Sequence, residues 1–162
     1  MAFLVFPCWA EKDPNLENLG TFGEWTAYTY HDESGRICYM ASQPTKSSGK
    51  YSKRGDVFLM ITHRPEEKTF NVVNTVAGYT YRKDSKPTLT VDNKKAIALI
   101  SHDDTAWAKD AKTDDQLVEQ MKAGSLGTLK GTSKRGTLTT DTFSFKGFSK
   151  AYQKIDEACG HS

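Results

Sequence analysis

Two copies of the tetrapeptide Ser-Lys-Arg-Gly, at residues 52–55 and 133–136, place pairs of positive charges at two distant points of the chain. Lysine and arginine bind anions, and a guanidinium can also hold a carboxylate or backbone carbonyls. Each copy precedes a stretch of β-strand character, where glycine permits a bulge or a positive φ. The repeat predicts two similar strand starts. In the alternative, Arg54 and Arg135 converge on one face and bind an anionic ligand.

The first copy runs into Asp56 and so also spells Arg-Gly-Asp, a tripeptide that many cell-surface receptors bind. A strong adhesion ligand presents this tripeptide at an exposed loop tip. Here it leads into the apolar run DVFLMITH. Adhesion through this motif is therefore not expected.

Other chemistry-bearing residues are few and lack the spacing of known motifs. The histidines show neither HExxH nor His-x-His spacing, and they are His31, His63, His102 and His161. His102-Asp103-Asp104 is predicted to be a solvated turn. GSLGTLKGTSK lacks the ending of a phosphate-binding loop, and no Gly-x-Ser-x-Gly elbow occurs. We expect no catalytic residues, no metal and no cofactor, while a catalytic site assembled from distant residues stays open.

Two tryptophans differ in their setting. Trp25 lies in the alternating stretch EWTAYTY, which predicts a position in the core. Trp107 lies between polar residues in DTAWAKD. It either packs over the edge of a sheet or lines a groove and contacts a ligand or partner.

The elements that would position these residues are mostly short strands. Runs rich in β-branched and aromatic residues predict strands, and they are EWTAYTY, RICYMASQ, TFNVVNTVAGYTY, GTLKGTS and GTLTTDTFSF. DVFLMITH is apolar throughout, which predicts a central strand buried on both faces. PTLTVD and KKAIALIS predict a hairpin that turns at Asp92-Asn93. TKSSGKYSKRG predicts a polar loop.

Two helices are predicted near the end of the chain. TDDQLVEQMKAG carries a capping box of Thr113 and Gln116 and ends at Gly124. SKAYQKIDEACG begins at Ser149 as cap, ends at Gly160, and places Cys159 on its apolar face. We therefore predict a mainly β fold, an antiparallel β-sandwich or barrel-like sheet with two short helices, one at the C-terminus.

The first residues and the cysteines bear on the compartment. Residues 1–10, MAFLVFPCWA, are predicted to be the remnant of a signal peptide whose start lies upstream, with a buried strand as the alternative. A polar segment, 11–20, precedes a single domain, 21–162. Removal of residues 1–10 leaves Cys38 and Cys159, which can pair in an exported protein. Two buried free thiols in a cytoplasmic protein are the alternative.

Charge and hydropathy limit the classes of partner. The net charge is only +2, and lysines are interspersed with acidic residues. This argues against a surface dedicated to nucleic acid. No apolar run reaches the roughly 20 residues of a membrane-spanning helix, so no membrane span is expected.

Several stretches resemble one known family. FGEWTAYTY, CYMASQP, RGDVFLMITHRP and KGTSKRGTLTTDTFSFKGFSKA are similar to the invasion-associated locus B family of exported alpha-proteobacterial proteins, and the similarity runs from about residue 21 to residue 159. The resemblance implies a signal-bearing, β-rich, periplasmic or secreted protein with cysteines near the positions of Cys38 and Cys159. It also implies a role in host-cell invasion or in the envelope, and it carries no established catalytic residues.

These observations lead to one expected function and one alternative. We expect a non-enzymatic exported protein that meets an unknown envelope or host-surface protein, with Arg54, Arg135 and Trp107 as candidate contacts. The alternative is a periplasmic enzyme or an anionic-ligand-binding protein that acts on an envelope component.

Overall fold

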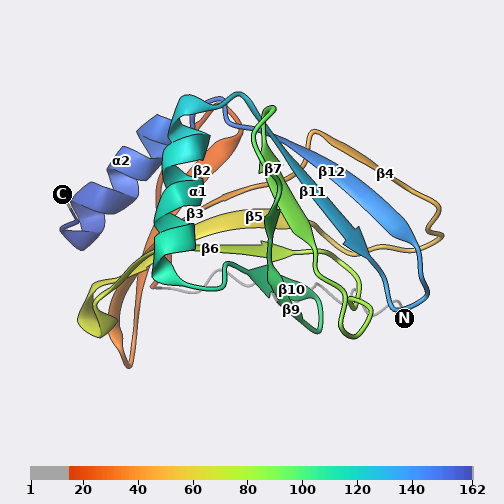
Figure 1. Ribbon diagram of the computed structural model, residues 1–162. Helices are drawn as coiled ribbons and strands as arrows, with labels where there is room; N and C mark the ends of the chain where they lie inside the picture. Colours follow the sequence, from red (N-terminus) through yellow and green to blue (C-terminus); the bar gives the residue numbers. More distant parts are fainter. Residues whose placement is uncertain (1–14, 162) are drawn as a thin grey trace, which may run out of the picture.

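The computed structural model describes residues 15–161, whose strands form two antiparallel sheets (Figure 1). The larger sheet has seven strands in the order β1-β2-β3-β5-β6-β10-β9. They are β1 (Glu17–Phe22), β2 (Trp25–Asp32), β3 (Gly35–Ser42), β5 (Phe58–Arg64), β6 (Thr69–Val76), β10 (Thr105–Trp107) and β9 (Ile100–His102). A short 3-10 turn, η2 (Pro65–Glu67), joins β5 to β6.

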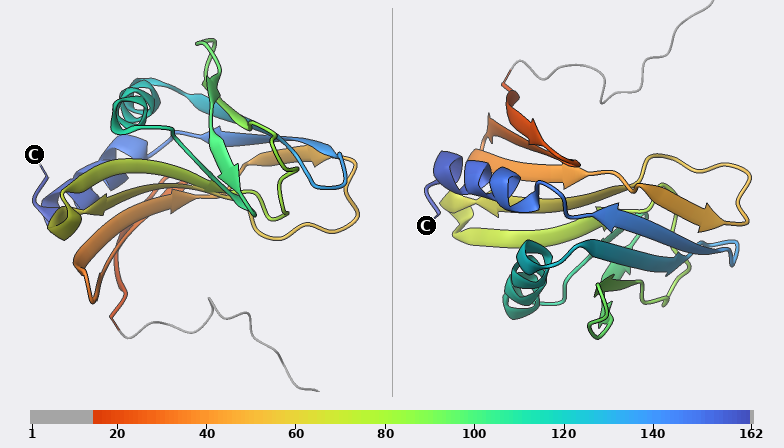
Figure 2. Two further views of the ribbon diagram at one scale, coloured as in Figure 1. Left: turned by 60° about the horizontal axis from the view of Figure 1, so that its bottom comes forward. Right: turned by 90° about the horizontal axis from the view of Figure 1, so that it is seen from above.

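The smaller sheet has five strands in the order β4-β12-β11-β7-β8. They are β4 (Lys46–Gly49), β12 (Leu138–Ser144), β11 (Leu126–Thr132), β7 (Thr88–Val91) and β8 (Ile97–Ala98). The two sheets pack as layers, as Figure 2 shows, and neither closes into a barrel among the described strands. The predicted antiparallel sandwich is therefore confirmed.

Two helices complete the second layer at one end of the sandwich. α1 (Ala111–Ala123) packs on β6 and β7, and α2 (Phe148–Cys159) packs on β1, β2 and β3. The segment between β4 and β5 and the β11–β12 hairpin lie at the opposite end (Figure 2). Neither helix in residues 15–161 has the length and apolarity to cross a bilayer.

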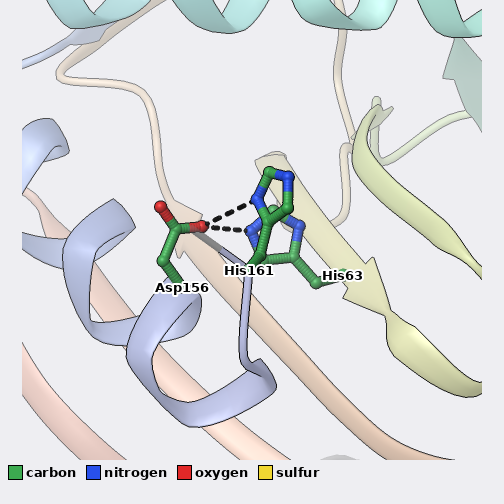
Figure 3. Close-up of side chains that lie close together, drawn as sticks. All are labelled: His63, Asp156 and His161. Atoms are coloured by element: carbon green, nitrogen blue, oxygen red, sulfur yellow. Dashed lines mark hydrogen bonds and ion pairs between the residues drawn. The ribbon is translucent and has the colours of Figure 1, made fainter.

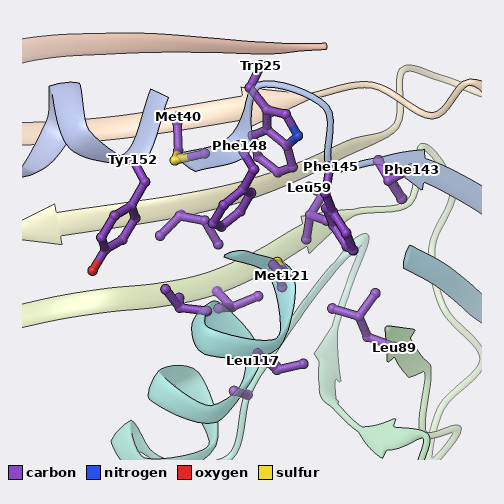
Figure 4. Packing of buried hydrophobic residues seen from close by; sticks show 14 of the residues in the cluster. Trp25, Met40, Leu59, Leu89, Leu117, Met121, Phe143, Phe145, Phe148 and Tyr152 are labelled. Carbon is purple, nitrogen blue, oxygen red and sulfur yellow. The ribbon is translucent and has the colours of Figure 1, made fainter. Parts of the chain in front are cut away.

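The core lies between the larger sheet and this second layer (Figure 4). Trp25 is fully buried, which confirms its predicted core position. Its ring meets that of Phe148 edge to face at 5.0 Å, and its Nε1 donates to the carbonyl oxygen of Ser144 at 2.9 Å. An aromatic pair of this kind contributes about 1 kcal/mol beyond the free energy gained from burying its surface, so it stabilises the packing of α2 on β2.

Two details of the strands differ from the sequence prediction. β5 is central, between β3 and β6, but Leu59 and Ile61 are buried while Phe58 and Met60 are only half-buried. Full burial on both faces was the wrong expectation, because no described element covers the outer face there. The polar loop contains a short exposed strand, β4, because Lys46–Gly49 pairs with the edge of β12.

Both helices begin differently from the prediction. The side chain of Asp110, one residue before α1, accepts hydrogen bonds from the backbone N–H and the hydroxyl of Thr113 at 2.8 and 2.6 Å. Thr113 is thus a donor to the cap, and the predicted capping box with Gln116 was wrong. α2 begins at Phe148 after Gly147, with no side-chain cap from Ser149.

Part of the domain prediction concerns residues that the structure does not describe. Residues 1–10, the predicted signal-peptide remnant, lie outside the described range. β1 begins at Glu17, inside the polar segment 11–20, and the described strands and helices then run as one sandwich to Cys159. The predicted hairpin at Asp92 is present as β7 and β8.

Candidate functional site

The outer face of the larger sheet carries a groove of about 690 Å³, called the outer groove below. Most of its lining is aromatic or aliphatic, and it includes Tyr30, Ile37, Tyr39, Met60, Val72 and Trp107. Thr62, Arg64 and Asn74 supply polar groups. A largely apolar groove with a few polar groups is typical of a binding site.

Strand alternation brings these side chains to one face. In β2, Trp25 and Ala27 point into the core, so the alternating positions of Tyr28 and Tyr30 point outward. The register pairs Tyr30 with Ile37 and Tyr28 with Tyr39 of β3. Because a one-residue slip would turn every side chain to the other face, the buried Trp25 also fixes the tyrosines in the groove.

The tyrosines form a contiguous aromatic surface. The rings of Tyr28 and Tyr39 stack at 5.0 Å, and that of Tyr30 meets Tyr39 edge to face at 6.0 Å. Burial, with the neighbouring phenols of Tyr28 and Tyr30, raises the pKa of Tyr39 to about 12. The Tyr39 hydroxyl is therefore neutral at physiological pH and acts as a hydrogen-bonding group, not as a base.

Trp107 lies on β10, one strand from the edge of the sheet, opposite Asn74 of β6. Its half-buried side chain lines the outer groove. The structure thus places this candidate contact in a groove, beside Met60 and Val72. Tyr30, Ile37 and Tyr39 were not among the predicted contacts. For Tyr30 a usable signal was present, because it is an aromatic residue at an outward position of EWTAYTY.

Arg54, the second candidate contact, is directed into the protein. Its guanidinium makes two hydrogen bonds with Asp141 of β12, at 2.8 and 2.7 Å, and its Nε donates to the carbonyl of Ala77 at 2.8 Å. The side chain of Arg54 is 5% exposed and that of Asp141 is 1% exposed. Burial favours a lower pKa for Arg54, but the bonds and charge of Asp141 outweigh it and raise the pKa above its usual value.

The Arg-Gly-Asp tripeptide is accordingly not a free unit, since the guanidinium of Arg54 is occupied by Asp141. The first Ser-Lys-Arg-Gly copy ends two residues before β5, and the second forms the turn before β12. Both precede strands, as predicted. They differ in backbone, because Gly136 has a φ of +88° and Gly55 does not adopt a positive φ.

Arg135, the third candidate contact, is exposed at the tip of the β11–β12 hairpin. The two tetrapeptide copies meet at one depression of about 630 Å³, called the loop pocket below. Arg135 lines it together with Lys50, Lys53 and Lys134. The two copies therefore converge, but through these residues, whereas the guanidinium of Arg54 faces Asp141.

A disulfide joins Cys38 of β3 to Cys159, the last residue of α2, across 121 residues of sequence. Both residues are buried, and their Cα atoms are 6.1 Å apart. The predicted pairing is confirmed, because the apolar face of α2 lies directly on β3.

Comparison with protein-family models matches residues 25–156 to the family described as invasion associated locus B (IalB) protein. The match covers most of the chain. The chain belongs to the invasion-associated locus B family. Searches of the curated proteins and of the solved structures gave no match.

A cluster that the sequence did not reveal lies at the end of α2 in this IalB-family chain, where Asp156 of α2 and His161, which follows the helix, meet His63 of β5 (Figure 3). His63 Nε2 lies 2.7 Å from Oδ1 of Asp156, and His161 Nδ1 lies 3.2 Å from the same oxygen. His63 is fully buried, and burial lowers its pKa below the usual value although Asp156 opposes this. Asp156 and His161 follow His63 by 93 and 98 positions in the sequence, so no short motif could indicate the cluster.

The ligand atoms of these three residues lie within 4.8 Å of one another, which raises the question of a metal site. His63 Nδ1 accepts the backbone N–H of Asn71 at 3.0 Å, so this network assigns the ring proton to Nε2. A metal-binding histidine shows the reverse, with a lone pair on the metal and the other N–H donated. The cluster of this IalB-family chain therefore fits a structural hydrogen-bond network better than a metal site.

Proposed function

We propose that this IalB-family protein is exported and acts as a non-enzymatic interaction protein, in the periplasm or after secretion. Its partner is an envelope or host-surface protein that docks on the outer groove. The observation that carries the binding role is the aromatic outer face of the larger sheet, uncovered by any described element. Aromatic side chains on an accessible surface supply much of the free energy of protein association.

Two features favour binding over catalysis. The outer groove holds rings, aliphatic groups, amide and hydroxyl groups, and Arg64. Among the residues that the structure describes, none that lines it carries a carboxylate, an imidazole or a thiol. His63 has both ring nitrogens engaged, by Asp156 and by Asn71, so it offers no free lone pair for a general base. An enzymatic role on an envelope component would need a different set of acid and base groups.

The disulfide supports the proposal that the protein is exported from the cytoplasm. Stable disulfides form in oxidising compartments and are rare in the cytoplasm. The Cys38–Cys159 bond ties the last helix to the sheet, which suits a protein that works outside the cytoplasm.

The compartment is tested by intact mass of the native protein from periplasmic, secreted and cytoplasmic fractions, with and without reductant. We expect the exported fractions to contain a chain that gains two hydrogens on reduction. A protein found only in the cytoplasm, with free thiols, would overturn the export part of the proposal.

Docking is tested with a photo-crosslinking amino acid at Tyr30, and at Lys130 as a matched exposed control on the smaller sheet. We expect one discrete adduct from Tyr30 and none from Lys130 in the native envelope. Excess wild-type protein should compete the adduct away, and excess Trp107→Ser variant should not. No adduct, or the same adducts from both positions, would contradict a partner on the outer groove.

A further inference from the structure

The loop pocket gathers positive charge without a matching negative charge. Lys50, Lys53, Lys134 and Arg135 line it, and no acidic residue of the described part of the chain does so. In residues 15–161 none of these four forms an ion pair, whereas Lys122 and Lys154 pair with Glu119 and Glu157. With a net charge of only +2 for the whole chain, this is a local concentration of cations. Such a concentration attracts anions.

One wall of the loop pocket is fixed by Arg54. Its bonds to Asp141 and to the carbonyl of Ala77 hold the segment that carries Lys50 and Lys53, and the Gly55 N–H donates to Gly78 O at 2.8 Å. The guanidinium also lies 5.2 Å from the ring centre of Tyr51 and 4.9 Å from that of Tyr79. Asp141 thus neutralises Arg54 and leaves the lysines without an internal counter-charge.

The other wall is fixed by the turn of the β11–β12 hairpin. The N–H of Lys134 donates to the carbonyl of Thr80 at 2.8 Å, and the N–H of Gly136 donates to Ser133 O at 2.8 Å. The Ser133 hydroxyl accepts the N–H of Thr137 at 3.1 Å. The backbone of both tetrapeptide copies is therefore held before a ligand arrives, which lowers the entropic cost of binding.

The remaining lining suits a polyhydroxylated body. Tyr51 and Tyr79 present aromatic rings, and Ser52, Thr80, Ser133 and Thr137 present hydroxyl groups. The volume of about 630 Å³ lies within the usual range of small-molecule sites. We propose that the loop pocket binds a sugar that carries phosphate or sulfate groups, with the anionic groups held by the lysines and Arg135.

The neighbouring surface limits the size of this ligand. A second depression shares Gly78, Tyr79 and Thr80 with the loop pocket, and it is lined by Asp56, Asp103 and Asp104. A long polyanion laid across both depressions would meet these carboxylates. The charge pattern therefore favours a compact anionic sugar over an extended nucleic acid or polysaccharide.

The test measures binding of glucose 1,6-bisphosphate by titration calorimetry at low salt, with glucose as the uncharged control. The double variant Lys134→Gln/Arg135→Gln should weaken binding at least tenfold, and Lys53→Gln should weaken it severalfold, because both copies contribute. The matched control is Lys94→Gln/Lys95→Gln, which removes the same charge from the exposed β7–β8 turn, outside the lining of the loop pocket. This control should stay within twofold of the wild type.

Vesicles separate a soluble sugar from a lipid headgroup that carries the same anionic chemistry. Flotation with vesicles that contain a phosphorylated glycolipid, beside phosphatidylcholine vesicles, is run on the same variants. Binding of the bisphosphate assigns a soluble ligand, and binding of the glycolipid vesicles alone assigns the headgroup. The proposal is overturned if neither the bisphosphate nor the glycolipid vesicles bind. It is also overturned if the Lys94/Lys95 control loses as much affinity as the loop-pocket variant. The loop pocket shares no residue with the outer groove, so these results do not depend on docking there.

Discussion

Arg54 and Asp141 show how one buried ion pair organises a surface. Both side chains are almost fully buried, and the pair joins the segment before β5 to the middle of β12. The removal of one member leaves the other charge buried and uncompensated, which is costly. The exposed Lys53, next to Arg54 in sequence, remains available for a ligand.

Replacement of Arg54 by alanine should lower the free energy of unfolding by about 3–5 kcal/mol, and Asp141→Ala should do the same. Urea denaturation measures the loss. Arg135→Ala, at the equivalent position of the exposed copy, should change stability by less than about 0.5 kcal/mol. Equal small effects at Arg54 and Arg135 would show that the buried pair does not hold the loop.

Asp114 is a buried acid in the first turn of α1 that accepts the backbone N–H of Val73 at 2.9 Å. Burial, with the nearby charges of Asp115 and Asp110, raises its pKa to about 6, although the Val73 N–H opposes this shift. The folded state therefore holds a proton that the unfolded state has released between about pH 4 and pH 6. The contribution of Asp114 to stability is present below this window and is lost as pH rises through it.

Asp114→Asn should remove this dependence, because the amide keeps an acceptor for Val73 and has no charge to bury. The stability of the variant relative to wild type should rise by about 1–3 kcal/mol between pH 4 and pH 7. Urea titrations at several pH values measure the difference. Glu33→Gln, which removes the same charge from an exposed position in the turn between β2 and β3, serves as the control for net charge. A difference that is flat with pH would contradict the raised pKa.

At the scale of elements, the start of α1 depends on a residue just outside the helix. Asp110 satisfies the N–H of Thr113, and the charge of a carboxylate is favourable at a helix N-terminus. Hydrogen bonds from the Thr113 N–H and hydroxyl lower the pKa of Asp110.

Asp110→Ala should lower Tm by about 2–4 °C, because the first turn of α1 loses its cap. Gln116→Ala should leave Tm almost unchanged, since Gln116 takes no part in the observed cap. Thermal unfolding followed by circular dichroism compares the two. The opposite ranking would restore the capping box of Thr113 and Gln116.

The disulfide belongs to the same scale, because it connects α2 to β3. It closes a loop of 121 residues, and in the chain-entropy model this contributes about 4–5 kcal/mol to stability. Cys38→Ala/Cys159→Ala should lower the free energy of unfolding by about this amount in urea. Reduction of the wild-type protein should give a similar loss and leave the double variant unaffected. A loss below about 1 kcal/mol would mean that packing of α2 alone holds the helix in place.

At the scale of the whole molecule, the fold separates two surfaces. The outer groove uses outward side chains of the larger sheet, and the loop pocket uses connections at the end away from the helices. No lining residue is common to both.

The two surfaces should therefore respond independently to substitution. The Trp107→Ser variant should no longer compete for the partner that crosslinks at Tyr30, while its affinity for glucose 1,6-bisphosphate stays within twofold of the wild-type value. Lys134→Gln/Arg135→Gln should show the reverse pattern. Free energies at distant sites without shared partners usually add, so the triple variant should show both losses in full. A loss of sugar affinity in Trp107→Ser would reveal coupling between the two surfaces.

Local pattern in the sequence was sufficient for most of the fold. The alternation in EWTAYTY placed Trp25 in the core, and the apolar face of the last helix oriented Cys159 toward the sheet. These features depend on the period of a strand or a helix, which neighbouring residues set. The same reasoning predicted two helices, the hairpin at Asp92 and the antiparallel sandwich.

Only the tertiary structure decided which faces are covered and which distant residues meet. The sequence could not show that the outer face of β5 is open, because an apolar run looks the same whether one or both faces are buried. It could not show that Arg54 pairs with Asp141 while Lys53, Lys134 and Arg135 form no ion pair within residues 15–161, or that His63 contacts Asp156 and His161. These contacts join residues roughly 80–100 positions apart, and they depend on strand register and sheet packing, which no local pattern specifies.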